Sequence, residues 1–158
     1  KGTKVLRKVA KKKKSAKVIL KRSNKFKVKS QKQAISAVRK SKKVYKNIGG
    51  SFKRVDKLKS LGEVGHHIPQ YAYMKSIGVS RNKGPAVLMK KSEHALTRTY
   101  SGRGRKTMIQ DKGLNARQHL AKDIRDVRSI VGRKYNKALL KSIKYAKSLD
   151  QFKRIRKK

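Results

Sequence analysis

The chain has 158 residues, of which 35% are hydrophobic, so it can bury one modest core but hardly two independent ones. Its 49 Lys and Arg residues against 7 Asp and Glu residues give a formal net charge of +42, which repels itself unless a polyanion neutralises it. Nucleic acid fits this charge better than an anionic membrane surface, because each neutralised phosphate releases counterions. No apolar run approaches the roughly 20 residues that span a bilayer, so membrane insertion is not expected. The absence of cysteine excludes disulfides, a thiolate nucleophile and zinc-ribbon sites.

The N-terminal part of the chain is purely cationic, since the first acidic residue is Asp56. Within it, Phe26–Lys29 alternates in the way a half-buried strand does, which predicts a short strand. Apolar residues from Ala34 to Tyr45 recur at near-helical spacing and predict a helix that ends at Gly49-Gly50. We therefore expect residues 1–55 to be a highly basic, partly helical extension that is partly disordered or in contact with DNA.

The C-terminal part of the chain carries two helical patterns separated by Gly132. The apolar positions of the first are Leu120, Ile124, Val127 and Val131, and those of the second are Tyr135, Leu139, Ile143, Ala146 and Leu149. These patterns predict a helical hairpin that covers the middle of the chain. A domain over residues 56–152 would then be followed by a basic tail at residues 153–158.

Histidines are concentrated in the middle of the chain. The chain has four, and His66, His67 and His94 lie close together in sequence, whereas His119 lies beside an apolar helix stripe and is expected to be structural. Successive side chains of a strand point to opposite faces, but a strand that bulges or ends just before Pro69 brings both adjacent histidines to one site.

The pattern around these histidines is specific. The run Gly65–Pro69, the apolar strand Ala86–Met89 and a helix opening at Ser92–His94 resemble the beta-beta-alpha-metal core of the His-Asn-His (HNH)/Endonuclease VII-like nuclease superfamily. The chain is similar in particular to the GHH-signature group of bacterial polymorphic toxin C-terminal domains. The resemblance covers about residues 62–104. It implies an α+β fold with an HNH core, to which the predicted helical hairpin is C-terminal.

The resemblance also implies roles for the histidines. His66 and His94 would hold one divalent metal ion, with Mg²⁺ the first expectation, although two imidazoles also suit Zn²⁺, Ni²⁺ or Mn²⁺. His67 would be the general base, because an imidazole with a pKa near 6.5 can take the proton of an attacking water. The surrounding cations favour the neutral form that both roles need.

The middle position of the family motif has two interpretations. Either Asn82 orients His67 after a loop adjustment, or a backbone carbonyl between Gly84 and Ala86 does. Further along, Arg98 is expected to support the transition state. Glu93 is expected to orient a ligand histidine or to pair with Arg98, although as an early-helix acid it needs no function.

Taken together, these residues predict a metal-dependent, largely sequence-nonspecific DNA endonuclease. The resemblance further implies an antibacterial toxin domain delivered from a producing bacterium into the cytoplasm of a target cell, and an acidic cognate immunity protein as partner. The expected nucleic-acid contacts are Arg81, Lys83, Arg103, Arg105 and Lys106. Two alternatives remain: the same fold acting on RNA, and a non-enzymatic ribosomal or nucleoid-like protein, which explains the flanks better but leaves the histidines unexplained.

Overall fold

The structure is a computed structural model in which residues 30–36 and 46–153 are described. The chain divides into two units, residues 1–37 and 38–158. In the first unit residues 30–36 are helical, which agrees with the start of the helix predicted there. Residues 37–45 of that predicted helix, the strand predicted at residues 26–29 and the end of the basic tail lie outside the described residues. Residues 46–48, which were predicted to continue the helix up to Gly49, are described and are not helical.

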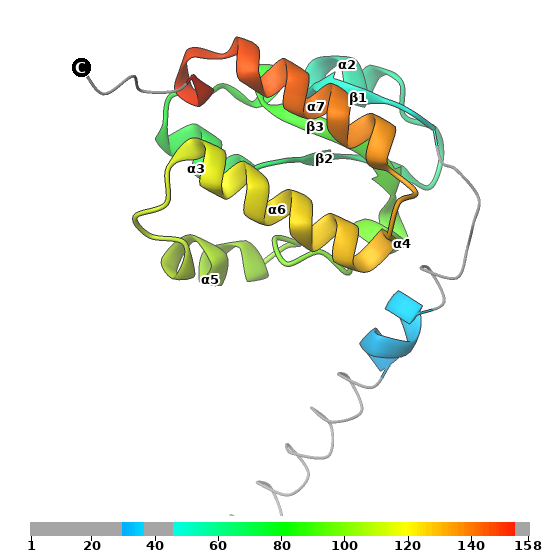
Figure 1. Cartoon of the computed structure of the whole chain (residues 1–158). Coiled ribbons are helices and arrows are strands. Elements are labelled where there is room, and N and C mark those ends of the chain that lie inside the picture. Colours follow the sequence, from blue (N-terminus) through cyan, green and yellow to red (C-terminus); the bar gives the residue numbers. More distant parts are fainter. Residues whose placement is uncertain (1–29, 37–45, 154–158) are drawn as a thin grey trace, which may run out of the picture. The chain divides into compact units, whose positions relative to one another are not determined.

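The second unit is α+β, with helices packed around a small antiparallel sheet (Figure 1). Its elements in chain order are β1 (Gly49–Ser51), α2 (Phe52–Lys57), β2 (Glu63–His67), α3 (Tyr71–Ser76), the 3-10 turn η1 (Arg81–Lys83), β3 (Pro85–Lys90), α4 (Lys91–His94), α5 (Arg103–Gln110), α6 (Ala116–Val131), α7 (Asn136–Ser148) and the 3-10 turn η2 (Asp150–Phe152).

The sheet has the strand order β1-β3-β2, so β3 is central and buried from Pro85 to Met89. Val87 pairs with Gly49 on the face covered by α7, whereas Leu88 pairs with Gly65 on the face covered by α2. A strand covered on both faces reads as a continuous apolar run, which is why β3 could be predicted from its sequence.

The β1 strand was not expected, because Gly49-Gly50 was predicted to end a helix. A Cβ on Gly49 would lie 2.1 Å from the carbonyl oxygen of Ala138, so only glycine allows α7 to approach β1 this closely. On the other face, Phe52 and Val55 of α2 join the core cluster. The folded unit therefore includes residues assigned above to the N-terminal extension, and the boundary at residue 56 is too late.

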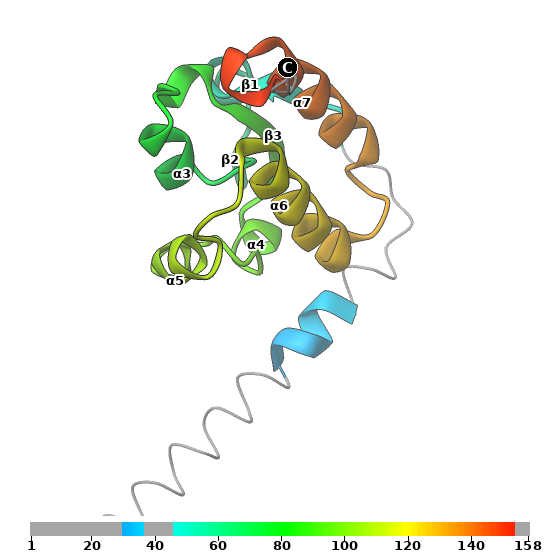
Figure 2. The ribbon, with the colours of Figure 1, turned by 60° about the vertical axis from the view of Figure 1, so that its left-hand side comes forward.

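Helices α6 and α7 lie side by side and form the predicted helical hairpin (Figures 1 and 2). The start of α6 is fixed by a capping box. The Asn115 side chain accepts hydrogen bonds from the backbone N–H groups of Arg117 and Gln118, and the Gln118 side chain accepts one from the backbone N–H of Asn115. Gly132 ends the helix with a positive φ of 62°. Within the described ranges, no helix is both long and apolar enough to cross a membrane.

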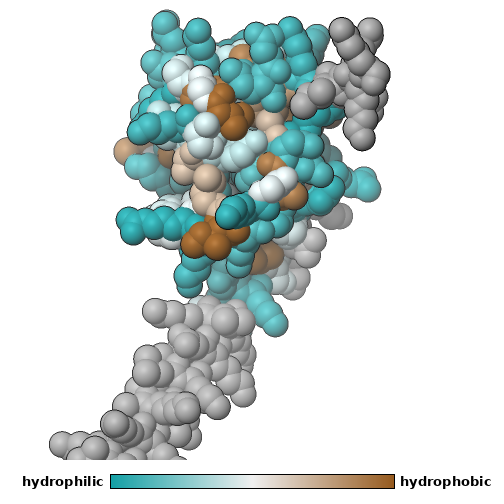
Figure 3. All heavy atoms as spheres, turned by 90° about the vertical axis from the view of Figure 1, so that its left-hand side faces the viewer, coloured by the Kyte–Doolittle hydropathy of each residue, from teal (hydrophilic) through white to brown (hydrophobic). Residues whose placement is uncertain are grey.

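On the face shown in Figure 3, hydrophobic atoms gather in separate small patches between hydrophilic ones. That face has no broad apolar area of the kind that marks a protein-docking surface.

Candidate active site

The three clustered histidines meet at one cavity, here called the histidine cavity. It has a volume of about 260 Å³, and the residues that line it are Phe52, Val64, Gly65, His66, His67, Gln70, Tyr71, Arg81, His94 and Thr99. Four consecutive residues of β2 border it although their side chains alternate in direction. The cavity therefore runs along the outer edge of β2, the edge that pairs with no strand of the sheet.

The rings of His66 and His94 lie against each other in the lining of this cavity. Their ring centroids are 4.7 Å apart and the rings are inclined by 59°. His66 is only 3% exposed, whereas His94 is half-buried with Tyr100 edge-on at 5.2 Å. Burial lowers the pKa of His66 well below its usual value, and burial followed by the charge of Arg103 lowers the pKa of His94. Both imidazoles are therefore neutral near pH 7.

His67 is held in one orientation by three groups. Its Nε2–H donates to the carbonyl oxygen of Arg81 at 3.0 Å, since a carbonyl can only accept. Its ring stacks on Phe52 with centroids 4.0 Å apart, and Tyr71 lies at 5.3 Å. Burial lowers the pKa of His67 to about 4, against a smaller opposing effect of the Arg81 carbonyl. The ring is neutral near pH 7, and Nδ1 is its unprotonated nitrogen.

The group that orients His67 differs from both sequence-based interpretations. Asn82 is exposed and is not among the described residues that line the histidine cavity. The acceptor is a backbone carbonyl, but it belongs to Arg81 in η1 and not to residues 84–86. The Arg81 guanidinium also lies 4.9 Å from the Phe52 ring centroid, so η1 supplies a carbonyl to His67 and a cation to the cavity wall.

Comparison with known proteins found no match, either to a protein-family model or to a curated protein or solved structure. The function has to be inferred from the geometry of the site.

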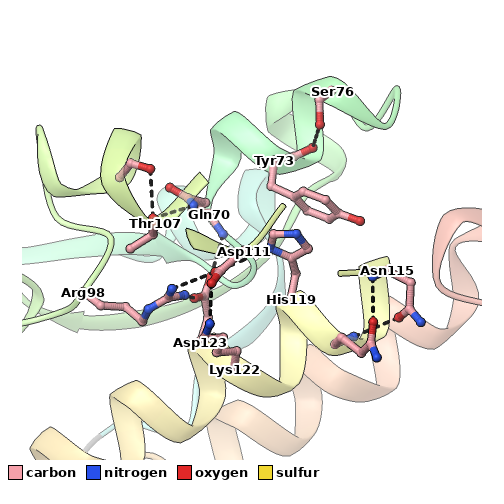
Figure 4. A network of polar contacts seen from close by, with 12 residues as sticks. Gln70, Tyr73, Ser76, Arg98, Thr107, Asp111, Asn115, His119, Lys122 and Asp123 are labelled. Atoms are coloured by element: carbon pink, nitrogen blue, oxygen red, sulfur yellow. Dashed lines mark hydrogen bonds and ion pairs between the residues drawn. The ribbon is translucent and has the colours of Figure 1, made fainter. Parts of the chain in front are cut away.

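Arg98 lies outside the described lining of the cavity, in a buried polar network (Figure 4). Its Nη1 donates to Asp123 at 2.6 Å and its Nη2 to Asp111 at 2.7 Å, and its backbone N–H donates to Asp126 at 2.8 Å. With the guanidinium committed to two carboxylates, the side chain joins α6 to the loop after α4. This corrects the expectation that Arg98 supports the transition state.

Glu93 is buried and also has a different partner from the one expected. Its carboxylate accepts from Lys134 Nζ at 2.5 Å and from the Tyr135 hydroxyl, and it pairs with neither Arg98 nor a ligand histidine. The contact fixes α4 against the start of α7. Glu93 thus positions the helix that carries His94.

The predicted nucleic-acid contacts fall in three places. Arg81 alone among them is in the described lining of the cavity, and Lys83 follows it in the exposed turn η1. Arg103 is half-buried, donates to the carbonyl of Ala95 and lies 5.4 Å from the Tyr100 ring centroid, so it braces the loop beyond His94. Arg105 and Lys106 are exposed on α5.

Sequence reasoning missed Phe52 and Gln70. Phe52 stacks on His67, but it lies in the segment that composition assigned to the extension. Gln70 donates its backbone N–H to Asp123 at 3.0 Å and its side-chain amide to Thr107 at 2.7 Å, contacts that no local pattern encodes. His119 is buried and stacks on Tyr73 at 3.5 Å, in agreement with its predicted structural role.

Proposed function

We propose that the chain is a metal-dependent endonuclease that hydrolyses phosphodiester bonds in DNA, with β2, β3 and α4 forming a beta-beta-alpha-metal core. The observation that carries the proposal is the meeting of three neutral histidines at one cavity. Two of them lie in contact with each other, and the third has its Nε2–H bound to a carbonyl so that Nδ1 is left as a base.

The donor set fits a divalent ion. His66 and His94 are neutral imidazoles 4.7 Å apart between centroids, and neither receives a hydrogen bond from the described part of the chain. Among the described residues, no group of three or more histidine or acidic side chains is arranged so that all of them could hold one metal ion, so the remaining ligands would be water and phosphate oxygens. This open coordination suits a catalytic site better than a structural one. Mg²⁺ is the first expectation, and Zn²⁺, Ni²⁺ and Mn²⁺ also accept imidazole ligands.

The protein residues have complementary tasks in hydrolysis. Nδ1 of His67 accepts the proton of the attacking water, and the Arg81 carbonyl holds the ring in the tautomer that leaves this nitrogen free. The Arg81 guanidinium, in the wall of the same cavity, attracts the phosphate. A bound divalent ion supplies Lewis-acid stabilisation of the charge that develops on the phosphate.

The net charge of +42 supports binding that depends on phosphates and hardly on base sequence. From the resemblance we extend the proposal to an antibacterial toxin domain that acts in the cytoplasm of a target cell and is neutralised by an acidic immunity protein. The same site would also fit RNA as substrate. A non-enzymatic nucleic-acid binder is favoured by the charge alone and is an outcome of the test below.

The decisive experiment incubates the purified chain with supercoiled plasmid and with RNA, each in Mg²⁺ or EDTA. We expect Mg²⁺-dependent nicking of the plasmid, and a loss of about 10²- to 10⁴-fold in rate for His67→Ala. The matched control is Lys112→Ala, which removes an exposed cation from the loop between α5 and α6. Full activity of His67→Ala would exclude His67 as the general base. Equal cleavage in Mg²⁺ and in EDTA would exclude a metal-dependent reaction.

Metal binding is tested separately from activity. Titration calorimetry with Mn²⁺ should show one site in the wild type and in His67→Ala, and none in His66→Ala or His94→Ala. A chain that coats DNA without nicking it under any of these conditions is a structural binder.

A further inference from the structure

A second cavity lies where α7 crosses β1, here called the basic cavity. It has a volume of about 580 Å³, and its lining residues are Gly49, Gly50, Ser51, Arg54, Lys141, Lys144, Tyr145 and Ser148. Three cations and three hydroxyls line it, and no acidic residue is among these described lining residues. The side chains come from β1, α2 and α7, so the fold and not one surface helix assembles them.

The positive charge of this cavity is not neutralised by any described acidic side chain of the chain. Arg54 and Lys144 are exposed, and neither forms an ion pair with any described residue. Lys141 Nζ donates to the carbonyl of Asn47 at 2.8 Å, which fixes the side chain but leaves its charge unpaired. The seven acidic side chains of the chain are all engaged by other groups. An external anion is therefore what the cavity can bind.

The floor of the basic cavity is backbone. Gly49 and Gly50 have no side chains, and β1 pairs with β3 on one edge only. Gly50 has a φ of +135°, and the nearest atom to a Cβ placed there is Arg54 Cδ at 4.0 Å, so the space beside it is open. Glycine at such a place allows an extended ligand to approach the main chain closely.

The two cavities lie next to each other in the fold, separated by a wall to which Ser51, Phe52 and the turn η1 belong. Ser51 lines the basic cavity and the next residue, Phe52, lines the histidine cavity. The turn η1 contacts a lining residue of each cavity. Its Arg81 carbonyl accepts from His67 of the histidine cavity, and its Lys83 carbonyl accepts from the Tyr145 hydroxyl of the basic cavity at 3.0 Å. A chain of phosphates that enters one cavity is thus brought within a few residues of the other.

We propose that the basic cavity binds the phosphodiester backbone of the strand whose scissile phosphate lies in the histidine cavity. Arg54 and Lys144 contact phosphates, Lys141 supports them, and the cavity sets how far the bound strand extends beyond the cleavage point. The inference rests on the proposed nuclease function, but its binding component can be measured without cleavage.

The test compares two double variants that remove the same charge. Arg54→Gln/Lys144→Gln empties the basic cavity of two cations, and Arg128→Gln/Lys112→Gln removes two exposed cations elsewhere. Each pair is placed in the His67→Ala background, and fluorescence anisotropy in EDTA measures the affinity for a short labelled duplex over a range of salt concentrations. Thermal unfolding by circular dichroism checks that each of these variants folds.

Loss of two phosphate contacts should reduce the slope of log K against log salt by about 1.8 for the cavity variant, with little change for the control. With an active His67, the cavity variant should raise KM for plasmid cleavage and leave kcat within about twofold, since a contact made equally in ground and transition states affects only binding. Equal slopes for the two double variants would overturn the inference while leaving the nuclease proposal intact. A selective slope change in a chain that never cleaves would retain the binding site and refute the nuclease.

Discussion

Replacement of Asp123 by Asn tests whether the buried network holds the histidine cavity in shape. Asp123 is 2% exposed, and its two oxygens accept from Arg98 Nη1 at 2.6 Å and from the backbone N–H of Gln70 at 3.0 Å. Asparagine has a single acceptor oxygen, so its NH₂ group must face one of these donors. Loss of a hydrogen bond to a charged group costs about 1.5–3 kcal/mol.

The direction of the Asp123 pKa shift helps to judge how much stability this substitution should cost. Burial raises this pKa, and the bonds from Arg98 and Gln70 only partly offset the effect, so the carboxylate is less well stabilised than in water. A neutral amide therefore recovers part of the cost, and we expect a loss of about 2 kcal/mol, or roughly 10 °C in Tm for a unit of this size.

The functional consequence follows from Gln70, which lines the histidine cavity three residues after His67, the last residue of β2. Below its unfolding transition, Asp123→Asn should reduce kcat for plasmid cleavage about tenfold through misplaced cavity residues. Asp111→Asn is the matched control, because Asp111 binds the same guanidinium and Lys122 but not Gln70. It should lose comparable stability in denaturant titration and retain kcat. An unchanged Tm for Asp123→Asn, or equal kcat losses for the two variants, would refute the reasoning.

Two further predictions concern stability. Gly49→Ala should destabilise the fold by about 3 kcal/mol in urea titration, because its Cβ would meet the backbone oxygen of Ala138. The control Gly102→Ala, whose Cβ would meet nothing within 4 Å, should not destabilise the fold, and equal effects of the two substitutions would contradict the close approach of α7 to β1. Acid should also destabilise the protein: since the pKa of His67 is about 4 when folded and near 6.5 when unfolded, the unfolded state binds more protons between these values, and stability present above pH 6.5 is lost as the pH falls through 4. Measured in EDTA between pH 7 and pH 4.5, His67→Ala should lose roughly 2 kcal/mol less than the wild type, and parallel losses would show that His67 is not buried in its neutral form.

The parts of the fold that could be predicted are those with a local signal. A buried central strand has to be apolar throughout, so Ala86–Met89 identified β3, and the apolar faces of α6 and α7 follow helical spacing. The proximity of His66, His67 and His94 in the sequence predicted a common site, and in the structure all three line one cavity.

The errors arose where distant residues decide the outcome. Glycine is a poor strand former, and Gly49 lies in β1 because α7, about 90 residues later in the chain, packs on it. Arg98 looked available because its partners, Asp111 and Asp123, are 13 and 25 residues away. A basic side chain in a cationic sequence is readily taken for a phosphate ligand, yet this one satisfies two buried carboxylates that would be costly without it.

The orientation of His67 by the Arg81 carbonyl has a consequence for genetics. Because the acceptor belongs to the main chain, no side-chain substitution at position 81 deletes it, and mutational scanning would report on the Arg81 guanidinium but not on this contact. An amide-to-ester replacement in the backbone, which weakens a carbonyl acceptor, would reveal a dependence that substitution of the twenty amino acids leaves hidden.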